Sequence, residues 1–567
     1  MGYNPVSISP ILPQETSMII PPCADPRQRA FVLPTRIVWQ SEGAAAPINA
    51  EFLLTSDTGQ AIVNALQCCT VKNTGKAPGL LLDFGQELNG GIQINIAQTN
   101  RSPVAVRIRF GESVSEAMGI PNGDHANHDF VFPLPRYGTQ EIGNTGFRFV
   151  RLDFVDEGSE AQIVSVRAVT LMRPLEYVGQ FECDDARLNE IWRVGARTVH
   201  LCLQDGVWDG IKRDRLVWIG DMHPETQVVA AVFGQLDIVP QSLDFVRDTT
   251  PLPGWMNGIS SYSIWWVLIQ KDWFQHGGDL AYLQNQRGYL LGLLELLRAQ
   301  ITDTGQEQMG EGRFLDWPTV GNLPALHAGL HALLLMGLDA GASLCRVLGE
   351  DDAALATEHA ASNLRRHTPA LVPASKQASS LLALSGLYDA AQVNADALAV
   401  DPLSGISSFY GYYVLQARAL AGDYAGCLEL IRTYWGGMLD LGATSFWEDF
   451  DLRWAENAAR IDELTPPGKI DVHTSYGDHC YKGLRHSLCH GWAAGPTAWL
   501  SEHVLGVQIV QPGCRVVRLV PHLGTLTRVS GTFPTPFGPL QITHVKGADG
   551  AVQTTYDAPD GVQVLLG

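Results

Sequence analysis

Apolar residues alternate with polar ones in the first third of the chain. The segment 92–97 (IQINIA) has Ile at every second position, and 104–110 (VAVRIRF) follows the same rule with Val, Ile and Phe. A period of two is typical of half-buried β-strands. Further short apolar runs lie near 150–154 and 163–171, with Gly, Asn and Pro between them. These runs predict a β-sandwich over residues 31–180.

The spacing of the apolar residues changes from two to three or four near Asp184. The residues with this spacing are Leu188, Ile191, Trp192, Ala196, Val199 and Leu203. The pattern predicts an amphipathic helix, and Asp184 or Asp185 would cap its first turn. Comparable patterns predict further helices around 222–247, 262–277, 280–303, 325–348, 352–364, 376–387, 408–420, 422–440 and 490–505. Roughly a dozen helices without strands between them favour helical hairpins closed into an α/α toroid.

The β-pattern returns after Gly506, in the runs 516–520, 540–545 and 552–566. Strands that are segregated from helices along the chain indicate separate domains rather than βαβ units. The first thirty residues are rich in Pro and have no sustained period, which is typical of an extended arm. The predicted parts are the arm at 1–30, the β-sandwich at 31–180, the helical toroid at 181–505 and a small C-terminal β-domain at 506–567.

Charge and hydropathy argue against two classes of binding partner, nucleic acids and membranes. The 567 residues are 46% hydrophobic, so the chain can bury large cores. It carries 39 Lys and Arg against 59 Asp and Glu, a net charge of −20. This charge repels a phosphate backbone, so we expect no nucleic-acid partner. No run of about 18 apolar residues lacks charges, so we expect no membrane partner either.

Targeting and cofactor signals are absent from the sequence. The first twenty residues lack the basic flank and apolar stretch of a secretion signal. We therefore expect a cytoplasmic protein as the sequence stands. If an upstream signal has been removed, we expect a periplasmic or secreted one. Ten Cys without a CxxC pair favour buried free thiols. Without a Gly-rich phosphate loop or a 12-residue calcium loop, we expect neither a cofactor nor a metal. A homodimer stays open as an oligomeric state.

Aromatic and acidic residues gather in the helical part of the chain. Thirteen of the 14 Trp lie between residues 192 and 499. Several stand next to a carboxylate, as in Trp208–Asp209, Asp316–Trp317 and Trp447–Glu448. A sugar is a ligand that uses both groups, because its C–H faces stack on aromatic rings and its hydroxyls bond carboxylates. Most single Trp residues would still be core residues, so we expect sugar stacking only from Trp residues on loops.

Two acidic stretches stand out, at 205–221 and 442–451. The first contains four carboxylates and three cations in 17 residues, interleaved with Trp, Ile and Leu. Such a stretch is either a solvated cluster of salt bridges or the floor of a cleft. Hydrolysis of a glycosidic bond needs two carboxyl groups, one to protonate the leaving oxygen and one ionised partner. Two acidic stretches far apart in sequence are suited to that reaction.

At the level of motifs, the chain resembles the α-L-rhamnosidases of glycoside hydrolase family 78. The resemblance covers about residues 80–560, and the motifs follow one another in the family's order. They are LLDFGQELNGGI, GFRFVRL, FECDDARLNEIW, DGIKRDRLVWIGD, FLDW, GATSFWE and SLCHGWAAGP.

The resemblance implies an (α/α)6 barrel flanked by β-domains and inverting hydrolysis of terminal α-L-rhamnose. It places the general acid at Asp214 and the general base at Glu448. The residues that it implies for the sugar pocket are Asp209, Arg213, Trp218, Asp221, Trp317, Trp447, His490 and Trp492.

The chain departs from the family's motif at the acid. That position is commonly Glu, and Asp214 is one methylene shorter, which withdraws the carboxyl by about 1.3 Å. The usual Asp-Cys-Pro opening is Asp209-Gly210-Ile211 here. Asp214 also stands between two Arg residues and could form a structural ion pair. Asp209, Asp221 and Glu225 are the alternative acids.

Two other functions stay open. One is a different barrel glycosidase, or a lyase acting on a uronate, in which the same cleft works with a different base. The other is a catalytically inactive carbohydrate-binding protein, which the shorter residue at the acid position favours. The sequence does not specify the aglycone or the linkage.

Overall fold

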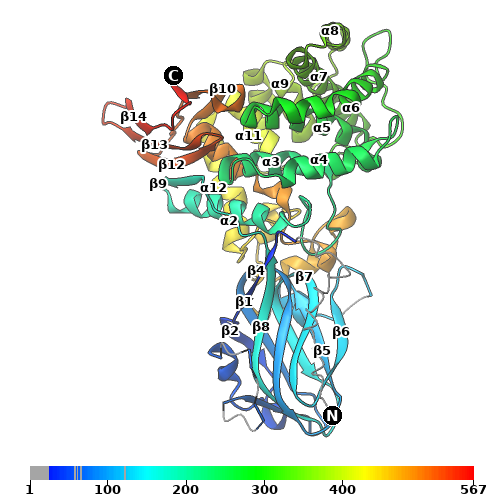
Figure 1. Ribbon diagram of the computed structural model, residues 1–567, viewed down its shortest axis with the longest axis vertical. Coiled ribbons are helices and arrows are strands. Elements are labelled where there is room, and N and C mark those ends of the chain that lie inside the picture. The colour runs from blue at the N-terminus through cyan, green and yellow to red at the C-terminus, as the bar shows by residue number, and fades with distance from the viewer. Residues whose placement is uncertain (1–24, 57–58, 61, 64–66, 121–122) are drawn as a thin grey trace, which may run out of the picture.

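The computed structural model describes residues 25–567 except 57–58, 61, 64–66 and 121–122. Figure 1 shows a body of long strands below and a larger body of helices above, with the C-terminal strands at the side of the helices. Most of the arm predicted at 1–30 lies outside the described residues. Its last residues are not an arm, because strand β1 begins at Gln28.

The N-terminal strands form one antiparallel sheet of eight strands, in the order β1-β8-β4-β7-β5-β6, with β2 paired to β4 and β3 to β8. The β-sandwich expected from the sequence stays a prediction; β4 pairs with β2, β7 and β8, and hydrogen bonds link all eight strands. The short strands expected at 92–97 and 150–154 are parts of the 21-residue β4 and the 17-residue β7. The elements are β1 (Gln28–Val32), β2 (Arg36–Gln40), β3 (Cys69–Lys72), β4 (Gly79–Thr99), β5 (Val104–Gly111), α1 (Val114–Met118), β6 (Asp129–Leu134), β7 (Gly138–Phe154) and β8 (Glu160–Met172).

The helical part runs from Ala186 to Trp499. Its helices are α2 (Ala186–Cys202), α3 (Ile219–Val232), α4 (Ile238–Thr249), α5 (Ser260–Gly277), α6 (Leu280–Arg298), α7 (Leu323–Leu348), α8 (Asp351–Arg365), α9 (Lys376–Leu384), α10 (Ala390–Val393), α11 (Gly411–Leu420), α12 (Tyr424–Asp440), α13 (Val472–Ser475) and α14 (Gly495–Trp499). Helix α3 packs on α5, α5 on α7, α7 on α9, α9 on α11, α11 on α14, and α14 again on α3.

These six helices are largely buried. Most side chains of α3, α5 and α11 are buried, as expected of helices surrounded by other helices. Helix α8 instead buries only Ala354, Thr357, Ala361 and Leu364, which lie on one face. Helix α7 is long and apolar enough to cross a membrane, but 83% of its most apolar window is buried inside the protein. Helix α7 is therefore explained as a core helix.

Two predicted helices are broken in the structure. The helix expected at 222–247 ends at Val232, with Phe233 as its C-cap, and Gly234 follows with φ of 80°, a left-handed conformation that suits Gly after a helix. Helix α4 then starts at Ile238. The helix expected at 490–505 consists of a 3-10 turn, α14 and a π turn.

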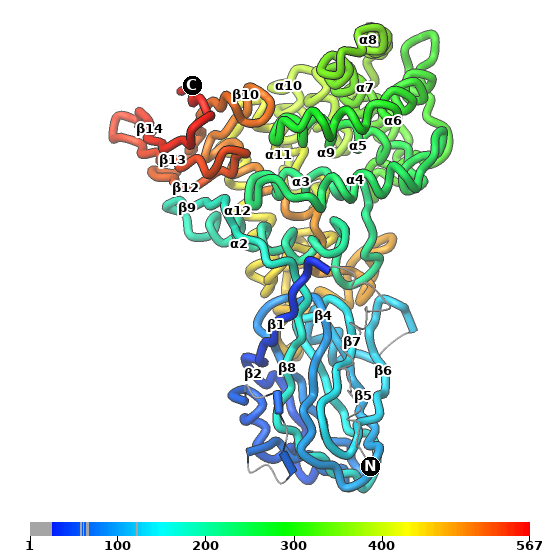
Figure 2. Tube along the Cα trace, in the orientation of Figure 1, coloured from blue at the N-terminus to red at the C-terminus, as the bar shows by residue number. Residues whose placement is uncertain are grey.

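The C-terminal strands form two small sheets. They are β10 (Val507–Gln511), β11 (Val516–Leu519), β12 (Arg528–Thr535), β13 (Gly538–Lys546), β14 (Val552–Asp557) and β15 (Gln563–Leu566). Strand β9 (Gln180–Cys183) precedes the helices, yet it pairs with β12 and completes the sheet β14-β13-β12-β9. Figure 2 shows β9 beside these much later strands. One hydrophobic core joins the helices to the C-terminal strands, and a second fills the N-terminal sheet.

The cysteines agree with the sequence prediction. Among the described residues other than Cys68, the eight cysteines carry free thiols, and all but Cys480 are buried. Cys23 lies outside the described residues. Free buried thiols in a chain with large cores contribute as small apolar residues.

Candidate active site

Nine of the ten site residues predicted from the sequence line one pocket of about 260 Å³. Larger hollows lie on sheet surfaces or behind α3 and α5, and they contain none of these ten residues. The lining residues are Asp209, Arg213, Asp214, Trp218, Asp221, Ile259, Tyr262, Gly312, Arg313, Phe314, Trp317, Glu448, Cys480, His490 and Trp492.

Three loops that supply the pocket are joined by backbone hydrogen bonds. The loop between α2 and α3 carries Asp209, whose carbonyl accepts the N–H of Gly491 at 2.8 Å. His490 donates its backbone N–H to Phe446 in the loop after α12, at 2.9 Å. In the same loop Glu448 donates its backbone N–H to Ser487 at 3.0 Å. Carboxylates that are distant in sequence are therefore held on one framework.

Arg213 lies between the two predicted catalytic carboxylates. One terminal nitrogen of its guanidinium contacts Asp214 Oδ2 at 3.3 Å, and the other donates to Glu448 Oε1. Glu448 is buried, and its second oxygen accepts the backbone N–H of Ser487 at 3.1 Å. The Asp214 side chain is 29% exposed, so it stands nearer to solvent than Glu448 does.

The backbone turns sharply at Asp214. Asp214 and Arg215 both have left-handed φ angles, 55° and 57°. This conformation costs a non-Gly residue about 1–2 kcal/mol. Two hydrogen bonds of Arg215 hold the turn: its backbone N–H donates to the Arg213 carbonyl at 2.7 Å, and its Nε donates to the Ile211 carbonyl at 3.0 Å. A strained turn kept in place by specific contacts is common at functional sites.

His490 connects a second pair of carboxylates. Its Nε2 lies 3.2 Å from Asp221 Oδ2, and its Nδ1 lies 3.9 Å from Glu448 Oε1. Burial alone would lower the pKa of His490, but Glu448, Asp221 and Asp209 raise that pKa above its usual value. The imidazole is therefore favoured in its charged form between two carboxylates. Tyr262 donates its hydroxyl to the other oxygen of Asp221 at 2.8 Å.

Burial acts on two further carboxyls of the pocket. It raises the pKa of Asp209 well above its usual value and also raises the pKa of Asp221, where the hydrogen bond from His490 opposes the rise. Asp209 accepts the backbone N–H of Leu216 at 2.9 Å, which holds the loop before α3.

One wall of the pocket is aromatic. Trp218, Tyr262, Phe314 and Trp317 contact one another in sequence, edge to face, with ring centroids 6.1, 6.4 and 5.2 Å apart. Trp492 lies near His490, with ring centroids 4.4 Å apart. An apolar wall facing a charged floor can receive the C–H face and the hydroxyls of a sugar together.

Trp447 is the predicted pocket residue that does not line the pocket. It is 1% exposed and packs edge-on against Phe450 with ring centroids 5.5 Å apart, so it is a core residue. Asp316 is also buried behind the pocket, where it accepts the hydroxyl of Ser407 at 2.5 Å, and burial raises its pKa to about 6. Glu225 is fully buried and does not line the pocket.

Six lining residues were not predicted from the sequence. Tyr262 is the first residue of the apolar helix predicted at 262–277, and nothing in the sequence distinguishes it from a core residue. Phe314 is the first residue of the FLDW motif and could have been included with Trp317. The six are Ile259, Tyr262, Gly312, Arg313, Phe314 and Cys480.

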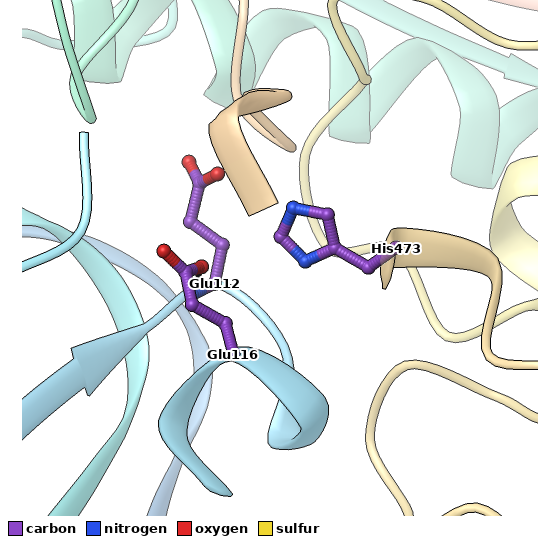
Figure 3. Close-up of side chains that lie close together, drawn as sticks. All are labelled: Glu112, Glu116 and His473. Carbon is purple, nitrogen blue, oxygen red and sulfur yellow. Dashed lines mark hydrogen bonds between the residues drawn. The ribbon is translucent and has the colours of Figure 1, made fainter. Parts of the chain in front are cut away.

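A buried cluster behind the pocket has the composition of a metal site. Ligand atoms of Glu112, Glu116 and His473 all lie within 4.8 Å of one another, the one such group found among the described residues (Figure 3). The Lys212 ammonium already lies there, 2.9 Å from Glu116 and 3.7 Å from Glu112. His473 has both ring nitrogens engaged, with the Ser113 hydroxyl at 2.7 Å and the His486 carbonyl at 2.9 Å. These residues do not fit a metal, because a lysine supplies the positive charge.

Comparison with known proteins agrees with the motif resemblance. Residues 176–364 match the family model described as the bacterial α-L-rhamnosidase six-hairpin glycosidase domain. No curated protein matches the chain.

Solved rhamnosidase structures share the fold. A family 78 rhamnosidase of Bacillus sp. GL1 aligns with a TM-score of 0.73 and 22% identity over 91% of this chain and 55% of its own. A rhamnosidase from Klebsiella oxytoca with rhamnose bound aligns with a TM-score of 0.67 and 19% identity, over 84% of this chain and 96% of its own. A Streptomyces avermitilis α-L-rhamnosidase in complex with L-rhamnose has a TM-score of 0.67 and 17% identity, over 88% of this chain and 50% of its own. The chain thus spans about half the length of the Bacillus and Streptomyces proteins.

Proposed function

We propose that this chain hydrolyses terminal α-L-rhamnose from oligosaccharides or glycosides, with inversion at the anomeric carbon. The match of residues 176–364 to the bacterial α-L-rhamnosidase six-hairpin glycosidase domain supports the proposal. The observation that carries the proposal is the position of Arg213. Its guanidinium binds Glu448 with one nitrogen and Asp214 with the other, so two carboxylates from distant loops face one pocket.

In this reaction Glu448 is the general base. It is buried, its carboxylate is fixed by Arg213 and by the Ser487 N–H, and one of its oxygens lies near His490. A fixed carboxylate can take a proton from a water as that water attacks the anomeric carbon. Asp214 stands nearer to solvent, where the leaving group departs, and protonates the leaving oxygen. An inverting pair of this kind is separated by roughly 6.5–9.5 Å, which admits the water.

The size and walls of the pocket favour a single terminal sugar. Its volume of about 260 Å³ is below the roughly 300–1,000 Å³ of sites for drug-sized ligands. The aromatic wall of Trp218, Tyr262, Phe314 and Trp317 would receive the apolar face of a deoxy-sugar. Asp209, Asp221 and His490 would bond its hydroxyls.

The architecture that we propose is an (α/α)6 toroid. The six successive contacts that return from α14 to α3 support a closed inner ring, and the half-buried α4, α6 and α8 would belong to the outer ring. We place the flanking β-domains at 31–180 and 506–567, with β9 contributed to the C-terminal one by the chain before α2.

The experiment that tests the proposal is hydrolysis of an aryl α-L-rhamnoside with a good leaving group, which responds even when the general acid is weak. Turnover supports the proposal. No turnover of this substrate, but release of an unsaturated sugar from a uronate polymer, would identify a lyase. Thermal stabilisation by rhamnose without any turnover would identify a binding protein.

Stereochemistry tests the finer part of the proposal. Proton NMR of the first sugar released, before mutarotation, should give the anomer opposite to that of the substrate. Early appearance of the retained anomer would remove the water-activating role of Glu448.

A further inference from the structure

The segment 484–488 packs against Glu448, the predicted general base. Ser487 binds Glu448 twice, because its carbonyl accepts the Glu448 backbone N–H at 3.0 Å and its own N–H donates to Glu448 Oε2 at 3.1 Å. A shift of Ser487 would therefore move both the backbone and the carboxylate of Glu448.

The same segment is held from the opposite side by a carboxylate of the N-terminal sheet region. Glu112 follows β5 directly, and its Oε2 accepts the Leu488 N–H at 2.6 Å. Its Oε1 accepts the Ser487 hydroxyl at 3.2 Å. Figure 2 shows the chain before α14, in orange, against the upper end of the N-terminal strands. Glu112 thus reaches from one body into the wall of the other.

The surroundings keep Glu112 in place. It is 1% exposed, and its backbone N–H donates to Glu116 Oε2 at 2.9 Å. Lys212 bonds Glu116 and the carbonyls of Leu484 and His486, so its ammonium links the cluster of Figure 3 to the segment behind Glu448. The neighbour of Lys212 is Arg213, which binds Glu448 itself.

The functional use of this cluster is not ion binding. Burial raises the pKa of Glu112, and Lys212 opposes that rise. Two buried carboxylates beside one ammonium are costly to keep, and such groups are often explained by what they position. Here the bonded partners of Glu112 are Ser487, which bonds Glu448, and its neighbour Leu488.

We propose that Glu112 is a positioning residue for Glu448, so that the N-terminal sheet region completes the active site through Ser487 and Leu488. The inference rests on the proposed role of Glu448 as the base. Glu112 touches neither the pocket nor a substrate, and it acts through the backbone of the segment 484–488.

The test compares Glu112→Ala with Glu112→Gln. Alanine removes both contacts to the segment, whereas glutamine can accept the Leu488 N–H and donate to the Ser487 hydroxyl oxygen. Glu112→Gln is therefore the matched control. With an aryl rhamnoside, we expect Glu112→Ala to lower kcat about tenfold to a hundredfold with KM within about threefold, the scale of a misplaced catalytic group.

Glu112→Gln should restore kcat to within about threefold of wild type. Wild-type kcat in Glu112→Ala, or an equal loss in Glu112→Gln, would overturn the positioning role. If Glu112→Ala does not fold, Ser487→Ala replaces it, because it removes the hydroxyl contact between Ser487 and Glu112. Unchanged kcat in Ser487→Ala would then overturn the positioning role.

Crystal structures separate this inference from the proposed function. If the wild-type protein hydrolyses no rhamnoside, the proposed function fails. The Glu448 carboxylate should still be displaced in Glu112→Ala, or in Ser487→Ala, and unmoved in Glu112→Gln. An unmoved carboxylate in all three variants rejects the positioning role on its own.

Discussion

The replacement Glu448→Gln addresses the proposed mechanism most directly, because the amide keeps the shape of the side chain and loses the base. The side chain is 4% exposed and accepts from two donors, Arg213 and the Ser487 N–H. A glutamine has one acceptor oxygen, so one of these donors is left facing an NH₂ group. The change therefore perturbs both the chemistry and one hydrogen bond.

The two effects have different sizes. Loss of general-base assistance lowers the rate by about 10²–10⁴-fold, which corresponds to about 2.7–5.4 kcal/mol of transition-state stabilisation at 1.36 kcal/mol per decade. One unpaired buried donor costs about 1–3 kcal/mol of folding free energy. The second cost lowers Tm but is small enough to leave the protein folded, so we expect an inactive, folded variant.

The assay is the initial rate on an aryl α-L-rhamnoside, with Tm and calorimetric titration of rhamnose on the same samples. Asp449→Asn is the matched control, because Asp449 is the neighbouring carboxyl and does not line the pocket. Its rate should equal that of wild type. Retention of more than about a tenth of the wild-type rate by a folded Glu448→Gln would refute the assignment of the base.

Three further outcomes are expected. Asp214→Asn should slow natural glycosides more than aryl glycosides, whose leaving group needs little protonation, and equal losses on both would assign Asp214 a structural role. Gly288 lies on the exposed face of α6 with nothing within 4 Å of an added Cβ, so Gly288→Ala should raise the free energy of unfolding by about 0.5–1 kcal/mol. Gly292→Ala should not, because its added Cβ meets Leu252 at 2.7 Å. Thermal melts that rank the two variants in the reverse order would contradict this. Burial raises the pKa of Asp449 to about 7, so this carboxyl destabilises the folded state increasingly as pH rises from about 4 to 7. Asp449→Asn should therefore leave Tm unchanged near pH 4 and raise Tm towards pH 8. A Tm difference that does not depend on pH would contradict this linkage.

The sequence was informative where a period or a motif extends over many residues. The helix at 184–203 and the strands at 92–97 and 104–110 were predicted from period alone. The strand at 92–97 is not half-buried as its period suggested, because Gln93 and Asn95 are buried as well. The motif around Asp214 and Glu448 predicted which residues share a pocket. These residues share a pocket because they lie on loops that backbone hydrogen bonds hold together.

Other features depend on contacts that have no local pattern. Trp447 has an acidic neighbour like the pocket residues, but the chain turns its ring into the core against Phe450. Tyr262 lies within a helix that is buried on all sides, so its exposure to the pocket leaves no period. The role of Glu112 depends on a contact with residues more than 370 positions later. Pairings of this length are not visible in a single sequence.

The pairing of β9 with β12 bears on how the protein is made. Cys183 lies opposite Val529 in the four-stranded sheet. Roughly 350 residues separate them, which a ribosome adds in on the order of half a minute at about 5–20 residues per second. Until β12 has emerged, β9 has an unpaired edge, and a nascent chain with such an edge is a target for aggregation and for chaperones. Truncation before Arg528 should therefore harm folding yield far more than the small size of the C-terminal sheets suggests.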